Sequence, residues 1–587
     1  MFEMRHPDIV LVTPFAGSNQ YHFDFSLDAA YEDLSLGYLA SSLSRAGYCV
    51  TVIDGPAMGL GREQILYRVR ESTPTVLGLS LINETLCECE EIAATVKAEL
   101  PDTYIVVGGH LPTNAPMDVL NGCQAFDAAV LGYGEDTIVE ICQRLMSGQG
   151  LEAVRGVAYR TDGGIVTNEP RSLRIDIDGI PFPSRYALSH KILQGRLPVA
   201  RMITSRGCPH RCTYCTTPAF LDAHGAIGTD RWQPRSPENV VDELERLVRD
   251  HGVKVVVFCD DEFLAKARGG TERALQIARL IQDRGLSVRF WSMFRVDDLD
   301  PADDCVIGEL KAAGLWGVFL GVETGSDHQL SSYAKGTSVE QNRLALELLR
   351  KHNILVEIGS MTFYPEVTYD ELADTTDFLE QTREASLFWH FTSRLAIYPG
   401  DHRLIEHLER RGLLLPSFSY RNEYAYRFAD PSIGILSGIL ADTGTRFHRF
   451  DTIVWNAKRV LQILTDSLTR NATVRHSAEC RDLGGVRSEL IRIDDEIGAA
   501  NCRCFRNLMC SSADGASGTK LRAILKEHAL RLERLSSAVR APLAAVEQRR
   551  SHWEGSLNGE ILDRLYLSDL WANWESQVSS LHNDSML

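Results

Sequence analysis

Three cysteines stand close together on a short loop near the middle of the sequence. Cys208, Cys212 and Cys215 follow a predicted strand and have the spacing C-x3-C-x2-C. Three thiolates at this spacing can hold three irons of a 4Fe-4S cube and leave the fourth iron open for an exchangeable ligand, which is a catalytic arrangement. Structural zinc would need a fourth ligand, and His210 lies inside the loop, where it cannot easily join the same tetrahedron. The spacing therefore favours an open iron-sulfur cluster over zinc or inert thiols.

Acidic residues form a second set of candidates, at the ends of two predicted strands. Asp260, Asp261 and Glu262 end one strand, and Glu323 closes another. Carboxylates at such places accept hydrogen bonds from an ammonium group or from ribose hydroxyls. The alternatives are an acidic cap on a helix N-terminus for the first turn and a solvated loop residue for Glu323.

Alternating strands and helices must position a third set of candidates. Residues 1–150 predict an α/β fold, with a doubly wound parallel sheet covered by helices on both faces. Ligands of such sheets bind beyond the carboxyl ends of the strands, where glycines let them approach the backbone. The predicted strands are Ile9–Thr13, Cys49–Asp54, Val76–Ile82, Tyr104–Gly108 and Ala128–Gly132. The candidates at their ends are Ser80, Gly108, Gly109, His110, Gly132, Gly134 and Glu135.

The same alternation resumes at Val199 and predicts a partial (β/α)6 barrel. The six expected strands are Val199–Ser205, Val253–Cys259, Ser287–Phe294, Gly317–Gly321, Leu355–Phe363 and Phe388–Ile397.

Changes of pattern along the chain predict its division into regions. An irregular stretch with two prolines and a glycine at its end predicts a linker at 151–190, after the first domain at 1–150. The partial barrel then occupies 191–430. Helical segments without strands, such as Phe447–Arg470 and Lys520–Arg540, predict a helical C-terminal domain at 431–587.

Length and charge exclude several classes of protein. The 587 residues predict several domains, and 61 Lys and Arg against 79 Asp and Glu give a net charge of −18. This charge opposes nonspecific binding to nucleic acid phosphates or anionic lipid. The segment from Met1 to Pro7 lacks the order of a secretory signal, and no apolar stretch approaches the roughly 18 residues of a membrane span. We expect a cytoplasmic protein with no nucleic acid partner and no membrane segment.

The cysteine loop, with Tyr214 before its last cysteine, resembles that of the radical S-adenosylmethionine (SAM) enzymes. In that family the open iron is chelated by SAM, which is cleaved by one electron to methionine and a 5′-deoxyadenosyl radical. The resemblance implies that Cys208, Cys212 and Cys215 are the metal ligands and that Tyr214 belongs to the cofactor site.

The acidic residues take their roles from the same resemblance. Asp260, Asp261 and Glu262 stand where the family commonly has a Gly-Gly-Glu turn that holds the SAM amino group, although the glycines are absent here. The segment from Gly321 to Ser326 resembles the one whose glutamate contacts SAM, which implies that role for Glu323.

Three features of the first domain resemble the cobalamin-binding domain of one large radical SAM subgroup. They are Gly108-Gly109-His110 with Thr113, the run Gly132-Tyr133-Gly134-Glu135, and the helix with Leu36-Gly37-Tyr38-Leu39-Ala40. The common Asp-x-His-x-x-Gly motif is absent, so no histidine from that loop is expected beneath cobalt. The lower cobalt face would meet the loop from Ser80 to Glu84, or water. Ligation by His110 is the less favoured alternative.

The resemblance implies a cobalamin-dependent radical SAM methyltransferase of secondary metabolism with a 4Fe-4S cluster, SAM and cobalamin as cofactors. In the family mechanism, one SAM methylates cobalamin and a second yields the radical that removes hydrogen from a carbon of a small-molecule or peptide substrate. The implied electron donor is a reductase or flavodoxin.

Three other functions compete with methylation by a radical route. They are a cyclase or rearrangement enzyme with the same cofactors, a nonradical C-methyltransferase of an indole-type substrate, and a noncatalytic cobalamin sensor. The intact cysteine triad argues against the sensor.

The C-terminal region contains cysteines and aromatic residues without a clear family pattern. Cys502, Cys504 and Cys510 are expected to be unpaired thiols rather than ligands of a second cluster. The aromatic residues of 418–428, with Trp455, have two interpretations, a wall of the substrate cavity or ordinary core packing.

Overall fold

The computed structural model describes residues 8–15, 32–188, 197–400, 402–419, 421–422, 424–470, 478–549, 551 and 555–564. Contacts divide the chain into two compact units. The first consists of Met1–Arg289, Ile397–Glu406 and Ser417–Glu423, and the second of Phe290–Ala396, His407–Pro416 and Tyr424–Leu587. The four regions expected from the sequence stay predictions.

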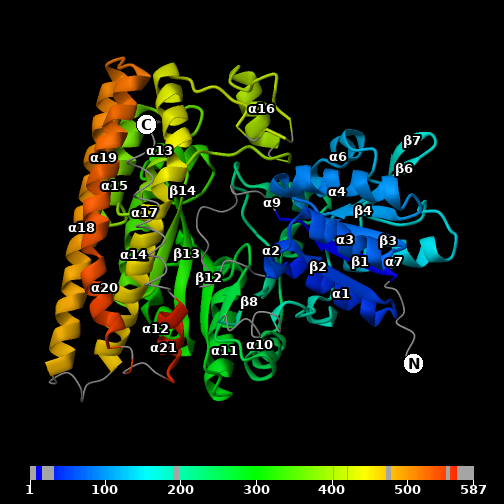
Figure 1. Ribbon diagram of the computed structural model, residues 1–587, viewed down its shortest axis with the longest axis horizontal. Coiled ribbons are helices and arrows are strands. Elements are labelled where there is room, and N and C mark those ends of the chain that lie inside the picture. Colours follow the sequence, from blue (N-terminus) through cyan, green and yellow to red (C-terminus); the bar gives the residue numbers. More distant parts are fainter. Residues whose placement is uncertain are drawn as a thin grey trace. The chain divides into compact units, whose positions relative to one another are not determined.

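The first unit contains a seven-stranded sheet in the order β2-β1-β3-β4-β5-β6-β7. Strands β1 to β5 pair in parallel, as the sequence predicts, and are β1 (Ile9–Thr13), β2 (Val50–Asp54), β3 (Val76–Ser80), β4 (Tyr104–Gly108) and β5 (Ala128–Val130). Helices cover the sheet on both faces (Figure 1). They are α1 (Leu34–Arg45), α2 (Gly55–Met58), α3 (Arg62–Ser72), α4 (Leu86–Glu99), α5 (His110–Asn114), α6 (Pro116–Gly122) and α7 (Glu135–Met146).

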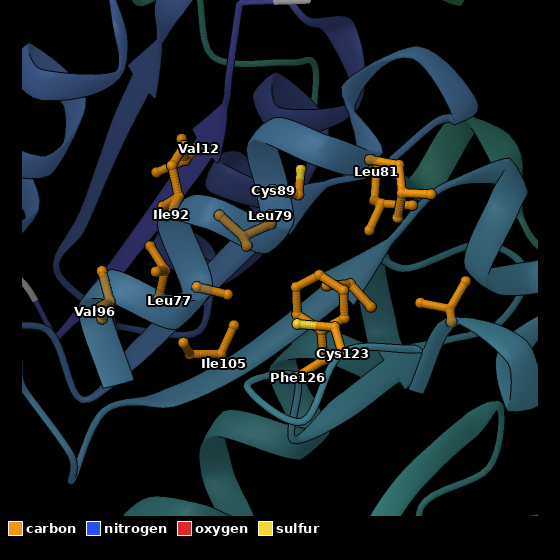
Figure 2. Packing of buried hydrophobic residues seen from close by; sticks show 14 of the residues in the cluster. Val12, Leu77, Leu79, Leu81, Cys89, Ile92, Val96, Ile105, Cys123 and Phe126 are labelled. Atoms are coloured by element: carbon orange, nitrogen blue, oxygen red, sulfur yellow. The ribbon is translucent and has the colours of Figure 1, made fainter. Parts of the chain in front are cut away.

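Alternation along each strand divides the core of this sheet into two layers. Leu77 and Leu79 belong to one buried cluster, with residues of α3 and α4, whereas Val76 belongs to another, with residues of α1 and α7. Figure 2 shows the first cluster, in which Ile92 and Val96 of α4 lie against Leu77. Because helices cover both faces of the sheet, the strands are mostly apolar, although Thr51 of β2 and Gly78 of β3 lie within their strands.

A hairpin extends the sheet within the stretch expected to be an irregular linker. Strand β6 (Val157–Thr161) pairs antiparallel with β5, and β7 (Gly164–Thr167) pairs antiparallel with β6. The linker prediction missed this hairpin because its outer strand is mostly exposed and lacks an apolar run.

Parallel strands with helices follow, and they confirm the second α/β region. Within the first unit, β8 (Val199–Met202) pairs with β11 (Val255–Phe258). Then β12 (Arg289–Arg295), β13 (Leu315–Glu323) and β14 (Leu355–Ser360) pair in parallel. The helices are α9 (Thr216–Ala223), α10 (Pro237–His251), α11 (Gly270–Asp283), α12 (Asp304–Ala313), α13 (Asp327–Ser332), α14 (Val339–Lys351), α15 (Tyr369–Gln381) and α16 (His402–Arg410).

The sixth expected strand is not a strand. Phe388–Phe391 forms a 3-10 turn, and one isolated parallel bridge joins Phe363 to Arg394. The carboxylate of Asp451 accepts hydrogen bonds from the backbone N–H groups of Phe388, at 2.6 Å, and of Trp389, at 3.1 Å. A side chain distant in sequence therefore takes the backbone donors that a strand would have used.

Among its described residues the C-terminal part consists of helices joined by turns, without a strand, as predicted. It contains α17 (Pro431–Arg470), α18 (Ala478–Ala513), α19 (Gly518–Ala538), α20 (Arg540–Glu547) and α21 (Leu557–Arg564). The three long helices α17, α18 and α19 pack along one another (Figure 1). Among the described residues, no helix combines the length and the apolar character needed to cross a membrane.

Candidate functional site

A cavity of about 370 Å³ lies within the first unit, at the carboxyl ends of strands β3 and β4. All the strand-end candidates of the sequence line it, namely Ser80, Gly108, Gly109, His110, Gly132, Gly134 and Glu135. Arg206, Gly207 and Asp261, which belong to the segments around the cysteine loop and the end of β11, line it as well. The wall of the cavity thus includes both the strand ends of the first sheet and the base of the cysteine loop, which is formed by Arg206 and Gly207 just before Cys208.

Glycine is required at one point of this wall. Gly109 has φ +127°, and a Cβ placed on it would lie 2.5 Å from the backbone oxygen of Leu81. Any side chain there would combine backbone strain with a clash that no rotamer relieves. The strand end is therefore bare backbone, which suits the close approach of a large cofactor.

A histidine and a carboxylate face the same cavity. Asp261 is exposed where it lines the cavity. The protein packed around it raises the pKa of its carboxyl, whereas the charge of His110 and a hydrogen bond from the backbone N–H of Gly207 act to lower that pKa. The imidazole of His110 packs against Phe220, with ring centroids 5.5 Å apart. These two side chains can meet the polar periphery of a ligand.

The three cysteines lie immediately after this wall. Cys212 is 8% exposed, and Cys208 and Cys215 are half-buried. Cys215 directly precedes α9, and burial raises the pKa of its thiol to about 11. Among the described residues no three His, Cys, Asp or Glu side chains are gathered around one ion position.

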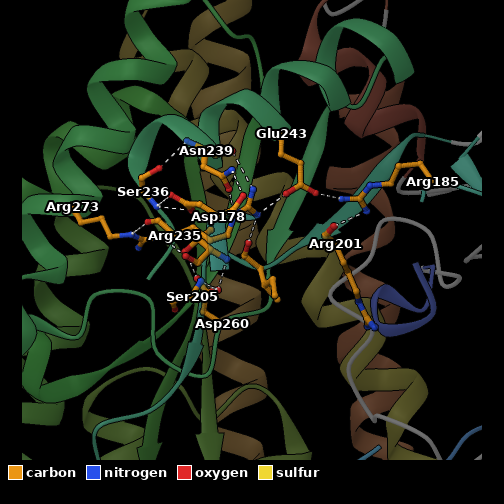
Figure 3. Close-up of polar contacts among 12 residues, drawn as sticks. Asp178, Arg185, Arg201, Ser205, Arg235, Ser236, Asn239, Glu243, Asp260 and Arg273 are labelled. Carbon is orange, nitrogen blue, oxygen red and sulfur yellow. Dashed lines mark hydrogen bonds and ion pairs between the residues drawn. The ribbon is translucent and has the colours of Figure 1, made fainter. Parts of the chain in front are cut away.

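A buried polar network fixes the strand that leads into the cysteine loop. Asp260 accepts hydrogen bonds from the backbone N–H groups of Thr204, at 2.5 Å, and Ser205, at 2.8 Å, and from the hydroxyl of Thr204 at 2.5 Å. Arg273 donates to the backbone oxygen of Thr204. The carboxylate that the sequence places near SAM is thus occupied in holding the backbone before the cysteines (Figure 3).

Arg235 extends this network toward helix α10. Its guanidinium donates to the backbone oxygen of Ile203 at 2.6 Å and to Glu243 at 2.5 Å, and Glu243 also accepts from Arg185 at 2.6 Å. All three charged side chains are at most 7% exposed. Buried charges of this kind are tolerated only when paired, so the network is rigid by necessity.

Glu262 points into the protein rather than toward the cavity. It is fully buried, its Oε1 lies 3.4 Å from the backbone N of Ala265, and its backbone oxygen accepts from Ser205 Oγ and Trp232 Nε1. These contacts stabilise the turn after β11. Of the three acidic residues in the turn, only Asp261 lines the cavity.

Glu323 ends β13, in the second unit, with strained backbone. It has φ +69°, which is rare for a residue other than glycine, and the register with β14 shifts beside it. Its Oε1 accepts from Lys335 Nζ at 2.7 Å, and both side chains are nearly buried. Strain held in place by a buried ion pair is typical of ligand-contacting positions.

The remaining candidates have simpler surroundings. Tyr214 is half-buried. Cys502 and Cys504 are buried on α18, and burial raises the pKa of each thiol to about 12. In the aromatic set, Tyr426 and Trp455 are buried and Tyr424 is 46% exposed, while Tyr420 lies outside the described residues.

Arg206 lines the cavity but had no role in the sequence analysis. Arg206 donates to Glu135 through both terminal nitrogens, and its guanidinium stacks over the rings of Tyr38 and Tyr133, at 5.4 and 4.6 Å. The spacing of Arg206 and Glu135 in the chain, 71 residues, carries no local pattern. The sequence showed only that Arg206 stands two residues before Cys208 and that Glu135 ends the Gly132–Glu135 motif.

Two regions of the chain match known protein families. Residues 26–142 match the B12 binding domain, and residues 202–379 match the radical SAM superfamily. An uncharacterized methyltransferase of Pyrococcus horikoshii is 28% identical over 65% of this chain and 79% of its own length. An anaerobic magnesium-protoporphyrin IX monomethyl ester cyclase of Synechocystis is 26% identical over 63% of this chain and 71% of its own length.

Two solved structures share the fold. The cobalamin-dependent S-adenosylmethionine radical enzyme OxsB has a TM-score of 0.68 at 20% identity and covers 97% of this chain and 84% of its own. The radical S-adenosylmethionine methyltransferase TsrM from Kitasatospora setae has a TM-score of 0.52 at 21% identity, over 64% and 71% of the two chains.

Proposed function

Because the chain belongs to the cobalamin-dependent radical SAM family, we propose that it is a methyltransferase that passes a methyl group from SAM, by way of cobalamin, to a carbon atom of a secondary-metabolite or peptide substrate. A radical SAM enzyme with a B12-binding domain has a 4Fe-4S cluster, SAM and cobalamin as cofactors. When bound, these supply one-electron cleavage of SAM and a carrier for the methyl group.

One observation carries the proposal. The strand ends that match a B12-binding domain, and the residues that lead into the cysteine triad, line the same cavity of one compact unit. A chain that only sensed cobalamin would not need its cavity to be walled by the base of a cluster loop. The arrangement instead suits two cofactors that work on one substrate.

The side chains have distinct tasks in this proposal. Cys208, Cys212 and Cys215 hold the cluster, and Asp260 holds the backbone before them. Bare backbone at Gly109 admits the cobalamin. Glu323 orients SAM through its carboxylate, kept in place by Lys335. Radical SAM chemistry needs an electron donor, and we propose a flavodoxin or a reductase in that role.

The relatives support a second candidate of the same family. Both methyltransferases and cyclases are similar to this chain at 26–28% identity, so a radical cyclisation with the same cofactors is the alternative. A nonradical methylation of an indole-type carbon is a third outcome of the test below.

The test is anaerobic turnover with methyl-labelled SAM and extracts that contain candidate substrates. Methylation by the radical route releases S-adenosylhomocysteine and 5′-deoxyadenosine in about equal amounts for each labelled product, provided that the radical is consumed. Labelled product without 5′-deoxyadenosine indicates the nonradical route. Substrate-dependent 5′-deoxyadenosine with no labelled product would overturn the proposal in favour of the cyclase.

A further inference from the structure

Arg206 links the wall of the cavity to the cysteine loop. It lies in strand β9 (Ser205–Gly207), which pairs antiparallel with β10 (Trp232–Pro234), two residues before Cys208. Its side chain is only 10% exposed, and that of its partner Glu135 is 13% exposed. Glu135 is the first residue of α7 and ends the Gly132–Glu135 loop of the first sheet, which lines the cavity.

The surroundings of Arg206 hold it in one position. Two aromatic faces, of Tyr38 and Tyr133, lie against its guanidinium, and Glu135 takes both terminal nitrogens. A planar guanidinium that stacks on aromatic rings and pairs with a carboxylate through both terminal nitrogens has little conformational freedom, unlike the flexible ammonium of a lysine.

The chain between Arg206 and the first cysteine is equally constrained. Gly207 has φ +81°, and a Cβ on it would lie 2.3 Å from the backbone oxygen of Arg231. This residue also lines the cavity and donates its N–H to Asp261. A displacement of the cavity wall is therefore passed to Cys208 through one rigid residue.

We propose that Arg206 is a positioning residue that couples cobalamin in the cavity to the cluster loop, so that each cofactor strengthens binding of the other. Cobalamin packs against Tyr38, Tyr133 and the Gly132–Glu135 loop, and this orders the partners of Arg206. The cluster orders Cys208 and, with it, Arg206 itself. Linkage then requires the two effects on affinity to be equal. The inference rests on the identity of the two cofactors and not on methyl transfer.

The test measures affinity for cobalamin with and without a reconstituted cluster, by anaerobic equilibrium titration of the full-length protein with hydroxocobalamin. In the wild-type protein we expect cobalamin to bind at least about fivefold more tightly when the cluster is present, within the usual range of coupling between sites. In Arg206→Gln this ratio should fall to about one, while iron content at full reconstitution stays near that of the wild type.

Two further variants separate coupling from stability. Arg206→Gln leaves Glu135 as a buried unpaired charge and should lower the melting temperature. The double variant Arg206→Gln with Glu135→Gln removes both charges and should recover much of the melting temperature without recovering the coupling. Tyr133→Leu keeps the ion pair and removes one stacking face, so it should reduce the ratio only in part and carries the test if the arginine variants do not fold.

The matched control is Arg211→Gln, on the cysteine loop itself. Arg211 pairs with Asp222 at 2.8 Å, but both side chains are more than 40% exposed and neither lines the cavity. The control should keep the wild-type ratio. An unchanged ratio in Arg206→Gln, or the same loss in Arg211→Gln, would overturn the inference. Because the readout is binding, an absence of methylated product would bear on the proposed function alone.

Discussion

The carboxylate of Asp260 accepts two hydrogen bonds of 2.5 Å from Thr204, 56 residues away in sequence, one from the backbone N–H and one from the side-chain hydroxyl. Asp260 lies two residues beyond β11, the strand beside β8, and three residues separate Thr204 from Cys208. The position of the first cysteine is therefore set by a side chain from the neighbouring strand.

This relationship predicts that Asp260→Ala destabilises the cluster loop before any SAM is bound. Two backbone N–H groups and the Thr204 hydroxyl would lose a buried acceptor, at a cost on the order of 1–3 kcal/mol for each group left without a partner. We expect a lower melting temperature and a lower iron content after reconstitution. If both stay at wild-type values while SAM affinity falls, Asp260 contacts SAM directly and the positioning role is wrong.

Removal of one cysteine of the triad should abolish the cluster. Cys212→Ala leaves one iron of the cube without a protein ligand, so we expect loss of the cluster absorbance and of reductive SAM cleavage. Cys502→Ala is the control, because that thiol is fully buried on α18 and outside the loop. A full cluster in Cys212→Ala would refute the assignment.

Replacement of Glu323 tests whether the two roles of SAM share one site. Glu323→Gln keeps the size of the side chain but breaks its ion pair with Lys335, so SAM binding and structural support should both weaken. We expect 5′-deoxyadenosine and S-adenosylhomocysteine to fall together, by at least about tenfold, which corresponds to 1.4 kcal/mol of lost interaction. Lys335→Met distinguishes support from contact, since it leaves the carboxylate available.

A fall in 5′-deoxyadenosine alone, with methylation of cobalamin at its normal rate, would show that SAM binds at two separate places.

The cavity predicts cobalamin binding without a histidine beneath the cobalt. His110 packs against Phe220 and faces Asp261, which suits contact with the periphery of the cofactor. His110→Ala should keep cobalamin bound with at most a modest loss of affinity. Electron paramagnetic resonance of the cob(II)alamin form should show no nitrogen coupling from a lower ligand. Imidazole coupling that disappears in His110→Ala would contradict this prediction.

Two buried histidines predict that the second unit loses stability in acid. Burial lowers the pKa of both His390 and His528 to about 3, whereas an unfolded histidine titrates near 6.5. Between these values the unfolded chain binds protons that the folded chain does not, so the free energy of unfolding falls as pH drops from about 6.5 toward 3. The slope is about 1.4 kcal/mol per pH unit for each histidine.

The measurement is denaturant unfolding at several pH values for the wild type and His528→Gln. Glutamine does not titrate, and its amide can replace the hydrogen bond of the imidazole to Asn501. In His528→Gln the free energy of unfolding should change less steeply with pH than in the wild type, because one of the two histidines no longer contributes to the slope. The same slope in both proteins would show that the buried His528 does not contribute.

Much of the fold followed from local patterns. Five parallel strands of the first sheet and five later ones were predicted, because buried strands of parallel sheets are apolar over their whole length. The hairpin β6–β7 and the missing sixth strand were not predicted. The outer strand of the hairpin lacks the apolar run that marks a buried strand. Phe388 is not in a strand because its backbone N–H donates to Asp451, a residue 63 positions away.

The site divides in the same way. Sequence alone determined which residue types are present and where they leave their strands: the spacing of Cys208, Cys212 and Cys215, and the glycines of the first sheet. Only the tertiary structure decided what each polar group faces. It turned Asp260 and Glu262 toward the backbone, left Asp261 in the cavity and joined Arg206 to Glu135. Spacing along a strand is fixed by covalent geometry, whereas partners of buried charges are chosen by which segments the folded chain brings together.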